Sequence, residues 1–239
     1  MSQRTYGFLL AFFATVFAGS AALLLWYGVK SHRQAAVYGR LAAAVQRADP
    51  TPTQAGEVTP PDEYRALSEE NPDMVGWIRI DGTDIDYPVV QRVDEPNYYL
   101  KHDFAGRYTD FGCPFAQENC DVQAPSDNVI LYGHNMKDGS MFSDLVRYQS
   151  RSFWETHRTI HFDTLTRRDE VLAVCRIAAD AFAFHRFVDA ADAMDFADYV
   201  AACKERALYD TGVNAQYGDK LLTLSTCEYS QENGRLLVV

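Results

Sequence analysis

The chain has 239 residues, of which 33 are Asp or Glu and 22 are Lys or Arg, so its formal net charge is −11. A chain this acidic argues against binding along a nucleic-acid backbone, which requires a dense basic surface. With 47% hydrophobic and 23% charged residues it is not a disordered chain, and five cysteines are too few for a scaffold built from disulfides.

Residues 7–29 predict a helix that crosses a membrane. The segment has no charged residue and is longer than the roughly 20 residues that span the hydrocarbon layer. Trp26 and Tyr27 lie near its end, where amphipathic rings favour the interface. The alternative is a signal peptide cleaved near the small residues 18–20, but the apolar run continues well beyond them. We therefore expect a retained anchor at 7–29 after a short terminus at 1–6, although the flanking basic residues do not fix its orientation.

Residues 30–61 are expected to connect this anchor to a compact domain. The stretch 34–48 is rich in alanine and predicts a helical stalk, whereas 49–61 combines prolines with threonine and glycine and predicts a linker. From residue 62 the composition is that of one folded domain, 62–239, which is long enough to bury a sizeable core.

The domain is predicted to be mainly β, because short segments of β-type residues alternate with turn residues, a pattern typical of a barrel or a sandwich. We expect strands at 75–80, 85–90, 128–132, 159–162, 170–178, 220–225 and 235–239, with a less distinct one at 113–117. Helices are expected at 62–70, 140–149 and 192–209. Asp192 is a candidate N-cap for the last helix, whose apolar face we expect to pack into the core.

Cys227 and Arg235 form the first candidate pair for catalysis. Cys227 follows the strand 220–225, and a turn at Asn233 leads the chain into the strand that begins with Arg235. If these strands form a hairpin, both side chains lie at the same end of the sheet. A guanidinium beside a cysteine favours the nucleophilic thiolate and can donate to an oxyanion when a carbonyl is attacked. Taken singly, Cys227 would more often be a buried apolar side chain and Arg235 a surface cation.

His134 is the third candidate. It comes just after the apolar strand 128–132 and follows Gly133, which lets the backbone approach another strand closely. A histidine at a strand end can serve as a general acid or base. The other histidines lack such a position, and we expect them to be structural or solvated.

These motifs resemble the sortases, and within them class B. The strings Tyr132-Gly-His-Asn-Met and Thr223-Leu-Ser-Thr-Cys, followed by Arg235, carry the resemblance, and the three catalytic candidates occur in the order of that family. Three earlier segments are also similar to the start of the class B barrel: 71–78 (NPDMVGWI), 85–91 (IDYPVVQ) and 98–104 (YYLKHDF). The match spans about residues 62–239.

The resemblance implies an eight-stranded β-barrel with N-terminal helices and a helix inserted between the sixth and seventh strands, here 192–209, preceded by the transmembrane helix. It also implies a single-pass, membrane-anchored cysteine transpeptidase with its domain outside a Gram-positive cell. The implied partners are secreted proteins with a C-terminal sorting motif such as N-P-x-T-N or S/P-P-x-T-G, a cell-wall peptide amine, and the lipid bilayer around 7–29. We expect no cofactor and no metal site, because no close pair of Cys and His residues has ligand spacing.

The resemblance assigns roles to the candidate residues. Cys227 would attack the backbone carbonyl of the sorting motif, and His134 would transfer the protons. Arg235 would stabilise the oxyanion, together with a backbone N–H near Glu228.

Further residues are candidates for substrate binding. Asn97, Leu100 and Tyr132 resemble positions that line the class B groove. Ser225 and Thr226 precede Cys227 and either bind substrate or are ordinary residues at a strand end. Glu228, directly after Cys227, is a further candidate for substrate binding.

The remaining cysteines are expected to have structural roles. Cys113 and Cys120 flank a short loop, and outside the cell they could be joined by a disulfide. Cys175 lies in an apolar strand and Cys203 on an apolar helical face, so both are expected to be buried thiols.

Two rival functions stay open. One is another Cys-dependent peptidase or acyltransferase, although the papain order places Cys before His and an L,D-transpeptidase would keep its Arg closer to the Cys. The other is a membrane-tethered binding module with an inactive site. Labelling of Cys227 by a mild electrophile would argue against the second.

Overall fold

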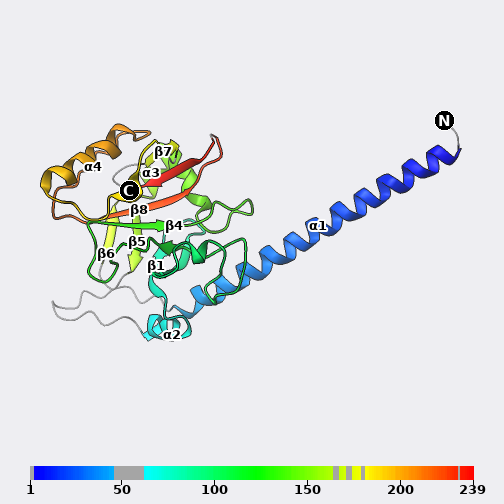
Figure 1. Ribbon diagram of the computed structural model, residues 1–239, viewed down its shortest axis with the longest axis horizontal. Coiled ribbons are helices and arrows are strands. Elements are labelled where there is room, and N and C mark those ends of the chain that lie inside the picture. Colours follow the sequence, from blue (N-terminus) through cyan, green and yellow to red (C-terminus); the bar gives the residue numbers. More distant parts are fainter. Residues whose placement is uncertain (1–2, 46–61, 164–166, 171–173, 179–180, 231) are drawn as a thin grey trace. The chain divides into compact units, whose positions relative to one another are not determined.

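The structure is a computed structural model that describes residues 3–45, 62–163, 167–170, 174–178, 181–230 and 232–239. The chain divides into two compact units, residues 1–40 and 41–239. The first unit contains most of helix α1 (Gln3–Ala44), and the second contains the β-sheet (Figure 1).

Helix α1 joins the predicted anchor 7–29 and most of the predicted stalk 34–48 in one continuous helix. Its most apolar 18-residue window has a mean hydropathy of 2.3, and the side chains there are exposed. By length and composition, this helix is able to cross a membrane. The predicted linker 49–61 lies outside the described residues.

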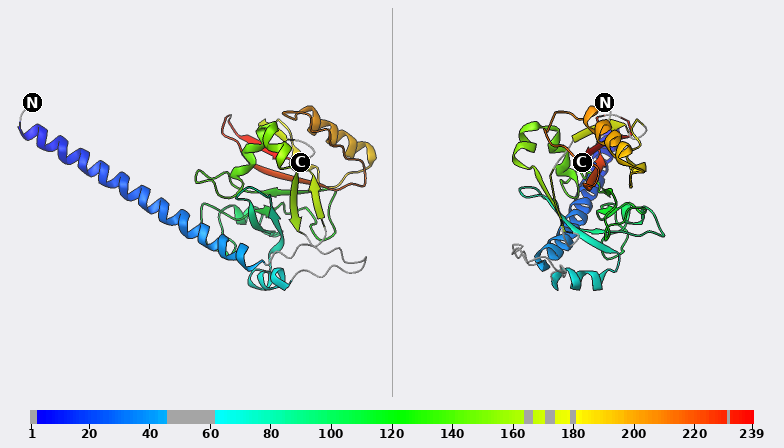
Figure 2. Two further views of the ribbon diagram at one scale, coloured as in Figure 1. Left: turned by 180° about the vertical axis from the view of Figure 1, so that it is seen from behind. Right: turned by 90° about the vertical axis from the view of Figure 1, so that its left-hand side faces the viewer.

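The second unit is built on one curled β-sheet, seen from two further sides in Figure 2. Its strands are β1 (Met74–Arg79), β2 (Asp86–Val90), β3 (Phe115–Ala116), β4 (Asn128–Tyr132), β5 (Thr159–Asp163), β6 (Arg167–Glu170), β7 (Val174–Ala178), β8 (Leu221–Cys227) and β9 (Gly234–Val238). They are hydrogen-bonded in the order β6-β5-β1-β2-β3-β4-β8-β9-β7. The strand predicted at 170–178 covers β7 and only the end of β6. The strand predicted at 128–132 has its predicted ends, and the others are present with slightly shifted ends.

The sheet curls, and the chain runs directly from one of its edge strands to the other. The edge strands β6 and β7 are consecutive in the chain and are separated only by residues 171–173. A segment of this length spans at most roughly 14 Å, so the facing ends of the two edge strands lie within that distance. Counted as one segment, β6 and β7 complete the eight strands of the predicted barrel, and helix α4 (Ala193–Glu205) follows the sixth strand as predicted.

The other helical elements are α2 (Asp62–Glu70), α3 (Arg151–Thr156) and the 3₁₀ turns η1 (Tyr98–Leu100), η2 (Ser143–Gln149) and η3 (Phe184–Arg186). The helix predicted at 140–149 is therefore a shorter 3₁₀ segment. The Ser143 hydroxyl accounts for its later start: it accepts the N–H of Met136 at 2.6 Å and lies 2.6 Å from the carbonyl oxygen of Ser140. These bonds hold the preceding residues in a loop.

Helix α4 starts at the predicted N-cap. The Asp192 carboxylate accepts the backbone N–H groups of Met194 and Asp195 at 2.9 and 3.0 Å, which satisfies two donors that have no partner inside the helix. Its buried face packs into the cluster formed with β7, β8 and β9 and consists of Phe196, Tyr199, Val200 and Cys203. The expectation that this face belongs to the core is confirmed.

The helix ends at Glu205, earlier than predicted, because the following residues pair with β7. Ala207 forms a β-bridge with Cys175, and the N–H of Leu208 donates to the carbonyl of Val174 at 2.8 Å. Residues 207 and 208 therefore pair with the edge of β7, and this pairing replaces the hydrogen bonds that would have continued helix α4.

Candidate active site

Strand β8 carries Cys227 at its end and lies between β4 and β9. It pairs in parallel with β4 and antiparallel with β9, so its backbone is fixed on both sides. In the β8–β9 register Cys227 is the direct partner of Arg235, and Nη1 of Arg235 donates to the Cys227 sulfur over 3.2 Å. The predicted hairpin is confirmed, and the thiol and the guanidinium are in contact.

His134 lies beside this pair because the chain after β4 is bonded to the end of β8. Three hydrogen bonds join the two segments: Gly133 N–H to Ser225 O at 3.2 Å, Thr226 Oγ1 to Gly133 O at 2.8 Å, and Asn135 Nδ2 to Cys227 O at 3.0 Å. Since the residues on both sides of His134 are held in this way, its backbone lies next to Cys227. The three residues therefore lie at one end of the sheet.

Gly133 is needed for close packing at this point. A Cβ built there would lie 2.5 Å from the ring of Phe142, a side chain that is fully buried. The N–H of Phe142 also donates to the carbonyl of His134 at 2.8 Å. The sequence predicted a close approach at Gly133, and the ring of Phe142 is what any larger residue would meet.

The imidazole of His134 has a defined partner. Its Nε2 lies 2.8 Å from the carbonyl oxygen of Leu100. A carbonyl oxygen only accepts hydrogen bonds, so Nε2 carries the proton in this arrangement. The neutral ring then has Nδ1 as its basic nitrogen.

Cys227 is the only cysteine of the chain that is not buried; all five are among the described residues. Burial raises the pKa of Cys120 to about 11 and the pKa values of Cys175 and Cys203 to about 12. These three thiols stay protonated at neutral pH and are poor nucleophiles. The expectation that Cys175 and Cys203 are buried is confirmed. Within the described part of the chain, no group of three or more His, Cys, Asp or Glu side chains could hold a metal ion.

Cys113 and Cys120, considered above as a possible disulfide pair, are both free thiols in the structure. The Cys113 thiol faces the carbonyl of Pro88 at 3.7 Å, and the Cys120 thiol faces the carbonyl of Asn128 at 3.5 Å. Both residues are buried, and each sulfur points to a different strand rather than to the other sulfur. Cysteine spacing alone gave no information on these directions.

Three of the predicted substrate-binding residues are part of the packed sheet. Ser225 and Thr226 are only 1% and 2% exposed, and the hydroxyl of Thr226 is engaged with Gly133. The buried hydroxyl of Ser225 has no hydrogen-bond partner among the described residues. Tyr132 is partly buried, and its hydroxyl donates to Oε1 of Gln117 at 2.6 Å. In this structure Ser225 and Thr226 therefore support the strand end and present no surface to a ligand.

Two other predicted residues are exposed beside His134. Asn97 has a φ of 63° and precedes the turn η1, and Leu100 closes that turn with 39% of its surface exposed. Since the Leu100 carbonyl bonds the His134 ring, these two residues are placed where a ligand could reach them.

Glu228 is buried immediately after Cys227. Its carboxylate accepts the N–H and the hydroxyl of Ser230, at 3.1 and 2.7 Å. Its own N–H donates to the carbonyl of Gly234 at 2.9 Å. The backbone N–H expected to assist Arg235 is thus already engaged within the β8–β9 connection.

Two residues at the site were not predicted from the sequence. Asn135 bonds the carbonyl of Cys227, and the exposed Tyr229 donates its hydroxyl to the carbonyl of Asn135 at 3.0 Å. Partial desolvation of its phenol and the nearby Cys227 raise the pKa of Tyr229. The position of Asn135 directly after His134 was the one available signal, and it does not reveal a contact with another strand.

Comparison with known proteins agrees with this geometry. Residues 78–239 match the family model of the sortase domain. Over 187 residues the chain is 37% identical to sortase B of Listeria monocytogenes, a match that covers 77% of this chain and 74% of that protein. A solved structure from Bacillus anthracis, described as similar to sortase B, has 31% identity and a TM-score of 0.76 and covers 87% of this chain and 94% of its own.

A Staphylococcus aureus sortase B–substrate complex is similar at 28% identity with a TM-score of 0.77, covering 88% of this chain and 96% of that one. Sequence, fold and the placement of the motifs therefore agree. The chain belongs to the sortase family, and within it to the class of sortase B.

Proposed function

We propose that this sortase is a membrane-anchored transpeptidase that cleaves a C-terminal sorting motif of secreted proteins and joins them to a cell-wall peptide amine. The observation that carries the proposal is the 3.2 Å contact between Arg235 and the Cys227 sulfur beside His134. In this proposal Cys227 is the nucleophile, Arg235 is the oxyanion donor and His134 is the acid–base group. The similarity to a structure described as a sortase B–substrate complex supports a site that binds a substrate.

In the first half of the reaction, the Cys227 thiol gives its proton to the free ring nitrogen of His134, and the thiolate attacks the carbonyl carbon of the scissile peptide bond. Arg235 donates to the resulting oxyanion, since a guanidinium group presents several N–H donors. When the tetrahedral intermediate collapses, the C–N bond breaks and His134 gives a proton to the leaving amine. The products are a thioacyl enzyme and the released C-terminal peptide.

In the second half, an amine of a cell-wall peptide attacks the thioacyl carbon. His134 accepts a proton from that amine, the C–S bond breaks, and the Cys227 thiolate is restored. No group outside the two substrates is consumed.

We also propose that 7–29 anchors the chain in the bilayer, with 1–6 in the cytoplasm and the catalytic domain 62–239 outside the cell. The length and hydropathy of α1 support the anchor. The orientation follows from the proposed substrates, since secreted proteins and the cell wall are accessible only from the outer face.

The test uses the full chain in detergent micelles with a panel of peptides that contain N-P-x-T-N-like or S/P-P-x-T-G-like motifs. We expect one of these peptides to be cleaved, a covalent adduct on Cys227 in the mass spectrum, and a transpeptidation product when triglycine or diaminopimelate is added. Cys227→Ala should abolish all three signals, while Cys120→Ala should leave them in place.

The outcomes separate the rival functions. Cleavage that survives Cys227→Ala would exclude the proposed mechanism. A thioacyl adduct that water resolves, with no amine product, would indicate a peptidase. A chain that forms no adduct with any peptide of the panel would be an inactive binding module.

A further inference from the structure

The turn η1 supports His134 directly. It is a single 3₁₀ turn in which the N–H of Leu100 donates to the carbonyl of Asn97 at 3.0 Å. The carbonyl of Leu100 is left to face outward from the turn, where it accepts Nε2 of His134 at 2.8 Å. The position of this one carbonyl therefore influences the orientation of the imidazole and the nitrogen that carries its proton.

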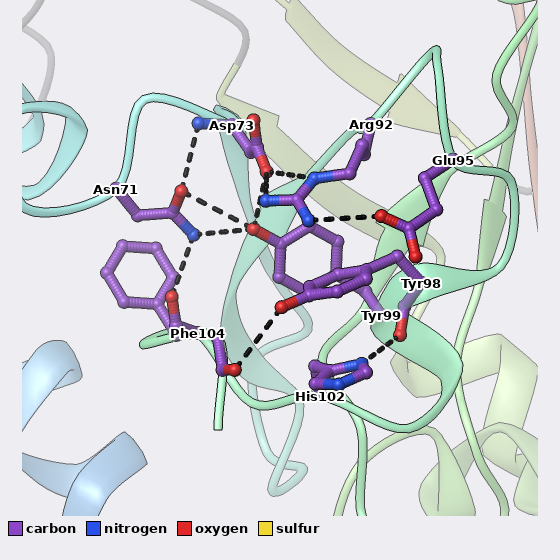
Figure 3. Close-up of polar contacts among 9 residues, drawn as sticks. Asn71, Asp73, Arg92, Glu95, Tyr98, Tyr99, His102 and Phe104 are labelled. Carbon is purple, nitrogen blue, oxygen red and sulfur yellow. Dashed lines mark hydrogen bonds and ion pairs between the residues drawn. The ribbon is translucent and has the colours of Figure 1, made fainter. Parts of the chain in front are cut away.

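The turn is fastened to the start of β1 by the buried side chain of Tyr99 (Figure 3). The Tyr99 hydroxyl donates to Oδ2 of Asp73 at 2.7 Å and accepts from Nδ2 of Asn71 at 3.0 Å. The same Oδ2 receives Nη2 and Nε of Arg92 at 2.7 and 2.9 Å. One carboxylate oxygen thus joins the turn, the start of β1 and the end of β2.

A stack of flat groups holds the other side of the turn (Figure 3). The guanidinium of Arg92 lies 3.8 Å from the centre of the Tyr98 ring. The Tyr98 ring stacks in turn on His102, with centroids 3.8 Å apart and planes within 3°. Nδ1 of His102 donates back to the carbonyl of Tyr98 at 2.7 Å. Arg92 therefore contacts both the Asp73 carboxylate on one side of η1 and the stacked ring of Tyr98 on the other.

Gly112 closes the contact between the turn and the imidazole. It has a φ of +65°, and a Cβ there would lie 2.6 Å from the carbonyl oxygen of Tyr99, 3.0 Å from that of Leu100 and 3.2 Å from Cδ2 of His134. A backbone without a side chain at this position lets the two carbonyls and the ring share one small space. A small movement of η1 would therefore change the position of the His134 ring.

We propose that Tyr99, Asn71 and Asp73 are positioning residues for catalysis: through the turn η1 they fix the Leu100 carbonyl, which holds His134 with its proton on Nε2 and leaves Nδ1 for proton transfer at the active site. The inference rests on the proposed function of His134. These residues lie in no catalytic motif, and an alternative in which they stabilise only their own loop predicts no change at the imidazole.

Two adjacent tyrosines provide a matched pair of variants in the full chain. Tyr99→Phe removes the hydroxyl that binds Asp73 and Asn71, whereas Tyr98→Phe removes a hydroxyl that donates to the carbonyl of Gly106 over a longer distance, 3.3 Å, and keeps the stacked ring. We expect Tyr99→Phe to lower kcat for peptide cleavage about tenfold, a fraction of the 10²–10⁴ that a positioned acid–base group contributes, with KM unchanged. Tyr98→Phe should leave kcat within about twofold of the parent.

A spectroscopic readout is independent of activity. In ¹⁵N spectra of the imidazole, assigned by the signal that is lost in His134→Asn, the parent and Tyr98→Phe should show a protonated Nε2 and an unprotonated Nδ1 at a pH where the ring is neutral. Tyr99→Phe should show averaging of the two nitrogens, because the carbonyl that favours one tautomer has moved. Asp73→Asn should act in the same direction and serves as a second variant if Tyr99→Phe folds poorly.

The proposal is overturned if Tyr99→Phe and Asp73→Asn keep the parent's kcat and the parent's imidazole spectrum. It is also overturned if both tyrosine variants lose kcat equally, or if KM rises while kcat stays constant. A parent chain that cleaves no peptide would instead contradict the proposed function, and the imidazole spectrum would still report on the tautomer.

Discussion

Arg235 reaches the sulfur of Cys227 because the two residues are direct partners on neighbouring strands, and such strands lie only about 4.8 Å apart. The guanidinium has five N–H donors arranged in a plane, so one of them can contact the sulfur while others face a carbonyl oxygen of the substrate. The register of β8 and β9, rather than the turn between them, sets this contact.

Replacement of Arg235 should therefore affect the chemical step. We expect Arg235→Ala to lower kcat by about 10²–10³, the loss seen when an oxyanion donor is removed. Arg235→Lys should restore only part of the rate, because a lysine keeps the charge but not the planar fork. Single-turnover cleavage by the full chain measures this. Arg176→Ala, at an exposed position on the neighbouring strand β7, is the control, and an equal loss there would contradict the assignment.

Which residues of the site could be predicted from the sequence depends on whether they act through a side chain or through the backbone. Cys227, His134 and Arg235 could be found because each lies at or just beyond the end of a predicted strand and has a side chain with distinctive chemistry. The partner of His134 could not, since it is the backbone carbonyl of Leu100, and every residue has one. The requirement for glycine at position 112 arises from the same contact between η1 and His134, so the sequence alone did not reveal it.

At the scale of elements, one carboxylate joins three segments at the far end of β4 and β8. Asp127, just before β4, receives Nζ of Lys220 at 2.7 Å and the N–H of Ala190 at 3.0 Å. The hydrogen bond from Lys220 and that from Ala190 hold the pKa of Asp127 below its usual value. The parallel pairing of β4 with β8 thus starts from an ionic contact.

This contact should make stability depend on pH. Since the pKa of Asp127 is lower in the folded chain, its contribution is present above the unfolded value, near pH 4, and is lost as the pH falls through the folded value. We expect Asp127→Asn to be less stable than the parent at pH 7, with a difference that shrinks toward pH 3. Urea unfolding at both pH values measures it, and the exposed Asp94→Asn is the charge-matched control. A difference that stays constant with pH would contradict the role of the ion pair.

Predictions of elements succeeded where the pattern was local. The strand at 128–132 was predicted with its observed ends, and Asp192 was identified as an N-cap. The end of α4 was missed because the pairing of Leu208 with Val174 competes with the helix. Most of β6 was missed as well, since Arg167–Glu170 is a charged edge strand without an apolar repeat, and its pairing with β5 is a tertiary property.

At the scale of the whole molecule, the proposed topology can be tested through its one cysteine that is not buried. Intact cells that express the chain should take up a membrane-impermeant maleimide on Cys227, because the domain lies outside the bilayer in our proposal. The label should disappear in Cys227→Ala and should be unaffected by Cys120→Ala. Labelling that appears only after the membrane is permeabilised would reverse the proposed orientation.

The two edges of the sheet have a consequence for solution behaviour. An open sheet exposes two rows of unpaired backbone groups, and each row can recruit a strand from another molecule and begin aggregation. Here Ala207 bridges Cys175 and the N–H of Leu208 binds the carbonyl of Val174 on the outer side of β7, and β6 is a short strand of charged residues, so an incoming strand finds no long apolar border to extend. Many copies concentrated on one surface could then remain separate molecules.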